Sequence, residues 1–260
     1  MARRDLEQFK VPGSSNAFYI PNFVSEEEQE YLIRKILESP RHKWKALANR
    51  RVFFSGGEVS KNVLIPQAMP SFLTGYPNII GRLQDTGAFD SSPHCAPNHV
   101  ILNEYLPGQG IMPHEDGPSY HPVVATISLG SHAVFHYYQY AIESDVSASA
   151  GASLQAGRTI NPRPVLSVLL EPCSAIVTTS SLYISHLHGI QDIEEDTVSI
   201  TEDGHAFVAG LESPVANWHM LSPTKAQAMH SGDILRRGTR YSLTCRDVEK
   251  VMGGKTFLRQ

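Results

Sequence analysis

Apolar and polar residues alternate over several short stretches in the second half of the chain, and this period of two predicts half-buried β-strands. In the stretch 98–106, Val100 and Leu102 fall on one side of the predicted strand. Asn103 and Tyr105 project together from the other side. An amide beside a phenol can hydrogen-bond a bound carboxylate, or can simply lie at the margin of a sheet.

The same alternation recurs near the C-terminus, in the stretch 239–247. Its polar face carries Arg240, Ser242, Thr244 and Arg246. Because a buried guanidinium without an anion is costly, two inward-facing arginines would indicate a bound dicarboxylate, which a guanidinium can grip through two parallel hydrogen bonds. An exposed strand with solvated arginines is the alternative.

Further strands are predicted at 18–21, 123–129, 133–138, 165–170 and 175–178. The Gly130-Ser131 turn signal suggests that 123–129 and 133–138 pair as an antiparallel meander. The segment 141–161 is rich in Ser, Ala and Gly, which predicts a flexible surface loop. The segment 191–232 is mostly polar without clear periodicity, and we expect a long excursion from a sheet.

Helical signals lie in the N-terminal part of the chain. Ser25 and Glu28 have the spacing of a capping box, and apolar residues follow at intervals of three and four as far as Pro40, which predicts a helix packed on a sheet. A second helix is predicted at 70–83.

The segment between these helices is basic and contains an aromatic residue. Its relevant residues are Lys43, Trp44, Lys45, Arg50 and Arg51. Such a stretch can grip phosphates and stack a base, as in nucleic-acid-binding proteins, although a solvated loop has the same composition.

Composition narrows the class of protein. The chain has 260 residues, 41% hydrophobic and 18% charged, with a formal net charge of −4, which is typical of a folded globular protein and not of a disordered one. Three widely separated cysteines argue against a disulfide framework or a zinc cluster. Without a signal peptide or an apolar run of about 18 residues, we expect an intracellular protein that does not contact membranes.

A candidate metal site lies in Pro113-His114-Glu115-Asp116-Gly117-Pro118. If this segment is extended, His114 and Asp116 point to the same side, about 7 Å apart along the backbone. Joined by a second histidine, they would form the two-His-one-carboxylate face that holds Fe(II) and leaves positions open for substrate and oxygen. With 12 histidines in the chain, a chance surface turn is the alternative.

The order of these features resembles the AlkB family of Fe(II)- and 2-oxoglutarate-dependent dioxygenases. The matching motifs are Asn103-Glu104-Tyr105, His114-Glu115-Asp116, His188-Gly189-Ile190 and the arginines Arg240 and Arg246 flanking Ser-Leu-Thr. Segments 22–28, 110–118 and 126–132 are most similar to the subgroup called AlkB homologue 6. The resemblance extends from about Phe18 to Arg246, apart from the two excursions.

The resemblance implies one mainly β (α+β) domain over residues 1–260, with a helical and basic lid region at about 18–97. A double-stranded β-helix, or jelly roll, would follow at about 98–248, with supporting helices on one sheet. Iron ligation, and with it catalysis, would fall to His114, Asp116 and His188. The cosubstrate 2-oxoglutarate would contact Asn103, Tyr105, Arg240, Ser242 and Arg246.

The implied activity is oxidative demethylation of N-methyl bases in RNA or DNA, using Fe(II), 2-oxoglutarate and O2 and releasing succinate, CO2 and formaldehyde. The basic lid would contact the nucleic acid, and we expect a monomer in the cytoplasm and nucleus. Two alternatives stay open: a 2-oxoglutarate hydroxylase or demethylase of proteins or small molecules, and an AlkB-like nucleic-acid-binding protein with little catalysis.

Two departures from the family pattern affect the site. Ser242 stands where many members have asparagine, so one polar contact to the cosubstrate is altered. The separation between His188 and Arg240 is long, which leaves His230, ten residues before Arg240, as a rival iron ligand and His186 as a weaker one. We favour His188 because His-Gly-Ile matches the family.

Overall fold

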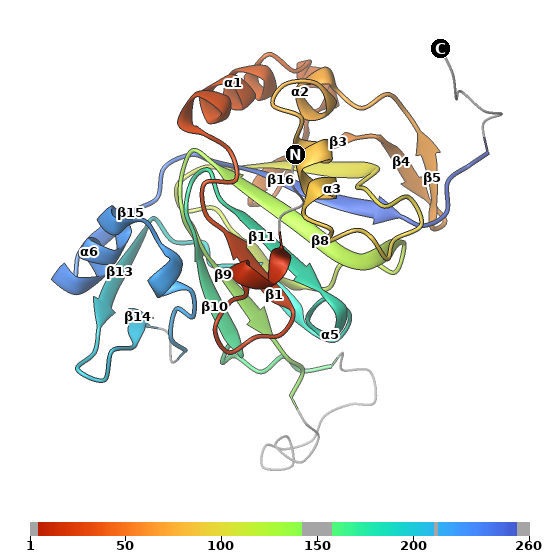
Figure 1. Cartoon of the computed structure of the whole chain (residues 1–260). Coiled ribbons are helices and arrows are strands. Elements are labelled where there is room, and N and C mark those ends of the chain that lie inside the picture. The colour runs from red at the N-terminus through yellow and green to blue at the C-terminus, as the bar shows by residue number, and fades with distance from the viewer. Residues whose placement is uncertain (1–4, 142–157, 211–212, 254–260) are drawn as a thin grey trace.

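The computed structural model describes residues 5–141, 158–210 and 213–253 (Figure 1). Most of the surface loop predicted at 141–161 lies outside these residues. Two antiparallel sheets face each other as the layers of a jelly roll, so the predicted double-stranded β-helix is confirmed. The larger sheet has seven strands, in the order β1 (Ala17–Ile20), β11 (Ala175–Thr179), β8 (Tyr120–Leu129), β16 (Arg240–Val248), β6 (His99–Tyr105), β3 (Arg50–Ser55) and β2 (Lys45–Leu47).

The smaller sheet has four strands, in the order β10 (Leu166–Leu170), β9 (Ala133–Tyr138), β12 (Leu187–Ile190) and β7 (Ile111–His114). Here the predicted meander is wrong, because β8 pairs with β11 and β16 while β9 pairs with β10 and β12. The turn between β8 and β9, with Gly130 at φ +83°, carries the chain from one sheet to the other. A turn signal shows where a strand ends, but not which strand it pairs with.

The alternation predicted for β6 and β16 is confirmed by their burial. Val100, Leu102 and Leu243 face the helices on the outside of the larger sheet. The intervening residues face the smaller sheet and line the space between the layers. In the register of the two strands, Arg240 lies opposite Tyr105 and Ser242 opposite Asn103.

Helices cover the outer face of the larger sheet (Figure 1). They are α1 (Glu26–Leu37), α2 (Ser71–Thr74) and α3 (Ile79–Asp85). The capping box at the start of α1 is present, with the Ser25 side chain accepting from the Glu28 backbone N–H. The helix predicted at 70–83 is interrupted between α2 and α3, because Pro77 has no N–H with which to continue a helix.

The segment 191–232 is more regular than its sequence indicates. It contributes β13 (Glu195–Ile200), β14 (Ala206–Val208) and α6 (Pro223–Ser231), and β15 (Ile234–Arg236) completes a three-stranded sheet. This insertion, residues 191–236, packs on the outside of the smaller sheet through a shared apolar cluster that includes Val168, Val198 and Met229. The predicted excursion from a sheet is confirmed, but its regular elements were not predicted, because the apolar residues of these short strands are surrounded by polar ones.

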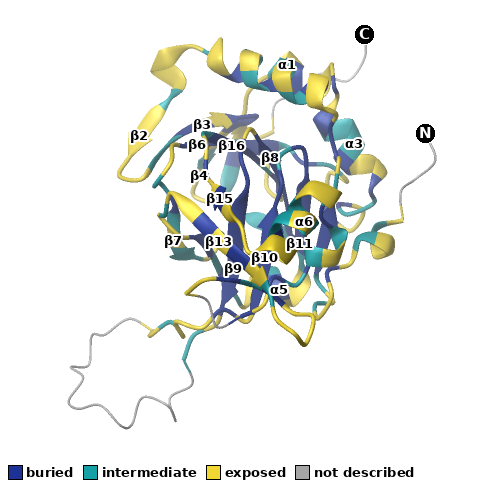
Figure 2. Ribbon diagram, turned by 90° about the vertical axis from the view of Figure 1, so that its left-hand side faces the viewer, coloured by how far each residue is buried: buried dark blue, intermediate teal, exposed yellow. Residues whose placement is uncertain are grey.

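Smaller elements complete the described chain. They are the hairpin β4 (Gly57–Ser60) and β5 (Val63–Pro66), α5 (Ser180–Ile184), and 3-10 turns at Leu6–Phe9, Arg41–Lys43 and Trp218–Met220. At the edge of the larger sheet β2 is exposed along its whole length (Figure 2). Among the described residues no helix is long and apolar enough to span a bilayer.

Candidate active site

A cavity of about 290 Å³ lies between the two sheets. We call it the catalytic cavity. Its wall contains all the residues predicted to bind iron or 2-oxoglutarate: Asn103, Tyr105, His114, Asp116, His188, Arg240, Ser242 and Arg246. They come from β6, β7, β12, β16 and the loop after β7, which are far apart in the sequence but adjacent in the jelly roll.

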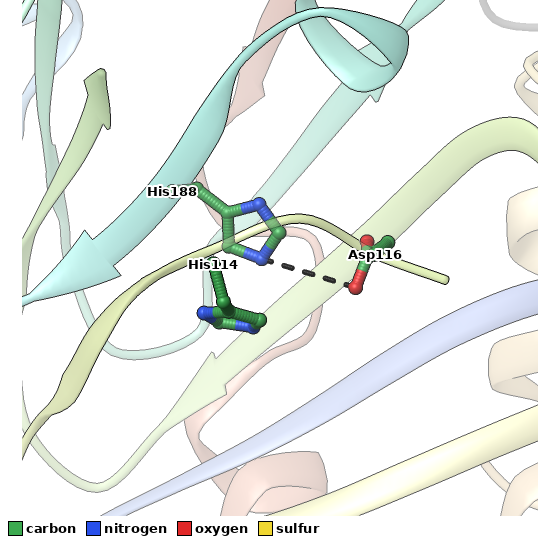
Figure 3. A group of neighbouring side chains, drawn as sticks. All are labelled: His114, Asp116 and His188. Carbon is green, nitrogen blue, oxygen red and sulfur yellow. Dashed lines mark ion pairs between the residues drawn. The ribbon is translucent and has the colours of Figure 1, made fainter. Parts of the chain in front are cut away.

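The candidate iron ligands meet where β7 pairs with β12. His114 lies directly opposite His188 in the register of these strands, and their ring centroids are 4.4 Å apart. Asp116 follows in the adjoining loop, with its Oδ1 3.9 Å from Nε2 of His188 (Figure 3). One ligand atom from each residue lies within 4.8 Å of the others, a spacing at which they could hold one metal ion.

The two imidazoles are held in the form that binds metals. Burial lowers the pKa of His114 and brings that of His188 to about 4, so both rings are neutral at pH 7. Nδ1 of His114 lies 2.9 Å from the Met112 carbonyl oxygen and donates to it. A neutral ring that donates through Nδ1 keeps its lone pair on Nε2, which is therefore the nitrogen free to bind an ion.

Asp116 is ionised and only half satisfied by the protein. Burial acts to raise the pKa of its carboxyl, but Arg246, with smaller contributions from His188 and His114, brings it below its ordinary value. Arg246 donates a short hydrogen bond to Oδ1, whereas the buried Oδ2 has no partner among the described residues. A buried carboxylate oxygen that lacks a donor fits a site for a cation.

Arg240 is the clearest sign of an anion site. The side chain is 3% exposed and burial lowers its pKa to about 10. One guanidinium nitrogen donates to the Ser128 hydroxyl at 2.8 Å, but the buried Nε has no partner, and no described carboxylate pairs with this arginine. A dicarboxylate reaching from the metal position to Arg240 would supply the missing negative charge.

The amide of Asn103 is held by two neighbours. Its Nδ2 donates to the Ser242 hydroxyl at 3.2 Å, and its Oδ1 accepts from Arg50 Nε at 3.2 Å. Ser242 thus contacts Asn103 as well as the cavity, so the serine at this position supports the amide across the strand pair. Tyr105, 6% exposed, places its ring 5.6 Å from the Arg240 guanidinium.

The rival histidines lie outside the catalytic cavity. His230 is in α6, where its ring contacts Trp218 at 5.9 Å between centroids. His186 places Nε2 2.9 Å from the Gln139 amide and Nδ1 3.1 Å from the Ser181 carbonyl oxygen. The structure therefore brings His188, and neither rival, to His114 and Asp116.

The five basic or aromatic lid residues are divided between two faces. Arg50 lines the catalytic cavity, and Lys43 and Lys45 line a neighbouring cavity. Arg51 turns to the helix side of the sheet, where it pairs with Glu104 at 2.5 Å, and its guanidinium lies 4.4 Å from the Trp44 ring.

Several cavity residues were not predicted. Phe135 stacks on His188 with 5.3 Å between ring centroids, and Leu47, Phe54 and Tyr120 also line the catalytic cavity. Every residue of β9 is buried, so burial on both faces leaves no alternation in the sequence that would show the direction of Phe135. Thr244 lies on the polar face predicted for 239–247, and Thr126, at an inward position of β8, could have been placed here by the same alternation.

Comparisons with known proteins agree with this geometry. Residues 16–246, well over half of the chain, match the model of the 2OG-Fe(II) oxygenase superfamily. A zebrafish (Danio rerio) protein named "Probable RNA/DNA demethylase ALKBH6" is 36% identical over 255 residues, which cover 98% of this chain and 95% of the relative. "Uncharacterized protein L905" of Acanthamoeba polyphaga mimivirus is 26% identical over 51% of this chain and 63% of its own length.

Two solved structures are more distant. One, described as "The structure of OsALKBH1", has a TM-score of 0.49 and 14% identity, covering 92% of this chain and 99% of its own. The other, an oxidoreductase of the 2OG-Fe(II) oxygenase family from Burkholderia pseudomallei, has a TM-score of 0.43 and 13% identity, covering 91% and 89%. On the family match and the zebrafish relative, the chain belongs to the 2OG-Fe(II) oxygenase superfamily and, within it, to the AlkB homologues: it is a 2-oxoglutarate- and Fe(II)-dependent dioxygenase.

Proposed function

We propose that this dioxygenase removes N-methyl groups from unpaired bases of RNA or DNA, with release of succinate, CO2 and formaldehyde. The observation that carries the proposal is that the His114, Asp116 and His188 group lines the same cavity as Arg50 and Phe54 of β3. A cation and an aromatic ring in the same cavity as an oxidation site suit an anionic polymer with flat bases. The similarity to the zebrafish relative supports the same substrate class.

His114, Asp116 and His188 would hold Fe(II), and Arg240 would take the distal carboxylate of 2-oxoglutarate. The bound iron, with 2-oxoglutarate and O2, supplies the oxidising power that inserts one oxygen atom into a C–H bond of the substrate while 2-oxoglutarate becomes succinate and CO2. Hydroxylation of an N-methyl group gives an N-hydroxymethyl group, which loses formaldehyde and leaves the N–H of the repaired base.

The protein's own contribution is to orient these groups and exclude water. Arg246 donates to Oδ1 of Asp116, which lies 3.9 Å from Nε2 of His188, and so holds the carboxylate next to the imidazole. Phe135 supports the His188 ring from one side. The cavity of about 290 Å³ has no room for a stacked duplex, so the target base must leave its stack to enter.

Parallel measurement of succinate and formaldehyde tests the proposal. The substrates are single-stranded RNA and DNA oligonucleotides that each carry one N-methylated base. We expect formaldehyde in step with succinate on at least one of them, and loss of both products in Asp116→Ala. Succinate without formaldehyde across the whole panel would contradict the proposal and favour a hydroxylase of proteins or small molecules.

A further inference from the structure

A second cavity, of about 440 Å³, lies beside the catalytic cavity. We call it the side cavity. Its wall includes Lys43, Lys45, Phe54, Gln67, His99 and Tyr120, of which Phe54 and Tyr120 also line the catalytic cavity. It lies at the start of β2: Lys45, the first residue of β2, pairs with Val52 of β3, and the three residues of β3 after Val52 have no partner on β2.

A stack of three rings separates the two cavities. The Phe54 and His99 centroids are 6.0 Å apart with 21° between the ring planes, and the His99 and Tyr120 centroids are 5.8 Å apart with 25°. His99 is 2% exposed, and burial lowers its pKa to about 4, so it stacks as a neutral ring. Phe54 ends the stack and is 39% exposed, which leaves its ring accessible to a flat partner.

Two lysines line the side cavity, and one of them, Lys45, lies next to the ring stack. Lys45 Nζ is 5.4 Å from the Phe54 ring centroid, and Lys43 Nζ is 5.6 Å from that of Phe53. Within the described part of the chain, neither lysine has a carboxylate partner. An accessible aromatic ring with one cation beside it and a second cation in the same cavity matches the base and the phosphate of one nucleotide. The side cavity also contains Glu58 and Gln67, which can accept from amino groups on the edge of a base.

We infer that the side cavity binds the nucleotide next to the target base, so that the enzyme recognises two consecutive unpaired nucleotides. The inference rests on the proposed function, because it assigns the second nucleotide of the same substrate. Phe54 and Tyr120 form a wall common to both cavities. A nucleic-acid strand that places one base on each side of this wall can bind in only one register. A duplex would have to unstack two neighbouring bases, so single strands are the preferred substrate.

The first test varies the substrate. Formaldehyde release is compared for a methylated nucleoside, for the two dinucleotides that carry an unmodified neighbour on the 5′ or the 3′ side, and for the same dinucleotides with an abasic neighbour. We expect one of the two neighbours to raise kcat/KM about 10-fold through stacking and phosphate contacts. Removing the base of that neighbour removes most of the gain.

The second test varies the protein and needs no turnover. The dissociation constant of metal-free protein for a fluorescent single-stranded decanucleotide is measured by anisotropy for wild type, Phe54→Ala and the double variant Lys43→Gln/Lys45→Gln. Each change should weaken binding roughly 5- to 10-fold. The matched control is Lys225→Gln in α6, on the insertion and outside both cavities, which should bind like the wild type.

The outcomes separate the two proposals. Equal kcat/KM for the nucleoside and both dinucleotides, or a gain that survives removal of the neighbouring base, would overturn the inference while leaving the proposed function intact. No formaldehyde from any substrate with wild-type enzyme would overturn both. A loss of binding in Lys225→Gln as large as in the double lysine variant would assign the effect to overall charge and overturn the side cavity as a specific site.

Discussion

His188 lies inside the catalytic cavity and His230 lies outside it, so variants of the two histidines test the assignment of the third iron ligand. Because only His188 lies with His114 and Asp116, we predict that His188→Ala loses most of its bound Fe(II). His230→Ala should retain the wild-type iron content, since its ring packs on Trp218 in α6. Metal analysis of both variants after anaerobic reconstitution measures this. Iron retained by His188→Ala and lost by His230→Ala would reverse the ligand assignment.

Replacing Arg240 by lysine tests whether the planar shape of the guanidinium, and not only its charge, is needed to bind the cosubstrate. Lysine keeps the positive charge but cannot offer two parallel N–H donors to a carboxylate. We predict that Arg240→Lys raises the KM for 2-oxoglutarate about 10- to 100-fold, the cost of a charged hydrogen bond. Succinate formation over a range of 2-oxoglutarate concentrations measures it. Arg236→Lys, at an exposed position of β15, is the control, and an unchanged KM in Arg240→Lys would place the distal carboxylate elsewhere.

The sequence predicted which site a residue lines wherever alternation along a strand decides the face to which its side chain points. This holds for Asn103 and Arg240, which the period of two places on the inner faces of β6 and β16. It fails for Phe54 and Tyr120, because these residues become neighbours only through the stack with His99, and no local pattern links three rings that come from different elements.

At the scale of elements, the pairing of β7 with β12 sets the distance between the two histidines. Gly110, just before β7, allows this close approach: a Cβ there would lie 2.3 Å from the Ile190 carbonyl oxygen of β12. We predict that Gly110→Ala lowers the free energy of unfolding by about 1–3 kcal/mol and weakens metal binding, because β7 must move away from β12.

Gly117 provides the matched control for this prediction. It lies in the loop after β7, and a Cβ there would meet nothing within 4 Å. Gly117→Ala should therefore keep the wild-type stability and metal affinity. Chemical denaturation and metal titration of both variants give the comparison, and equal values for the two would show that the close approach at Gly110 does not hold the strands together.

The insertion is tied to the jelly roll by a buried charge cluster. Asp196 of β13 accepts from Arg237 Nε at 2.8 Å and lies 3.0 Å from His132 Nε2. Burial acts to raise the pKa of Asp196, but its hydrogen bonds with His132 and Arg237 lower it to about 2. The carboxylate therefore stabilises the fold above its ordinary pKa, and this contribution is lost as the pH falls toward 2.

We predict that Asp196→Asn lowers the free energy of unfolding by about 2 kcal/mol at pH 7. The difference from the wild type should narrow between about pH 4 and pH 2, where Asp196 of the wild type becomes protonated. Urea unfolding at several pH values measures it, with Asp233→Asn, an exposed residue of the same insertion, as the control. A difference that stays constant down to pH 2 would mean that the charge of Asp196 does not contribute.

Element prediction succeeded where the pattern was local and failed where pairing was distant. The capping box at Ser25 located α1, and alternation located β6 and β16. The partner of β8 could not be predicted, because a residue's neighbours across a jelly roll are set by the whole topology and not by the adjacent turn. The excursion at 191–232 was predicted but its strands were not, because they are short and their apolar residues find their partners on the distant smaller sheet.

At the scale of the whole molecule, the position of a positive charge matters more than the net charge of −4. Arg50 faces the catalytic cavity and has no carboxylate partner among the described residues, whereas Arg51 pairs with Glu104 on the helix side of the sheet. We predict that Arg50→Gln lowers the salt dependence of binding to a single-stranded oligonucleotide by a slope of about 0.7, and that Arg51→Gln leaves the slope unchanged.

Binding isotherms at several salt concentrations measure both slopes. Thermal unfolding of each variant provides the control for the loss of the Arg51 ion pair, which joins β3 to β6. Equal reductions of the slope in the two variants would mean that binding of nucleic acid depends on the summed charge of residues 43–51 and not on the face on which each arginine lies.

The exposed edge of the larger sheet at β2 has one more consequence. An unpaired strand edge offers N–H and C=O groups with which the strand of another molecule can pair, the first step of aggregation. β2 limits this by its length of three residues and by the charge of Lys45 at its start. The lysine that we place beside the phosphate thus also keeps copies of the protein apart, and its neutralisation should make the protein less soluble at high concentration.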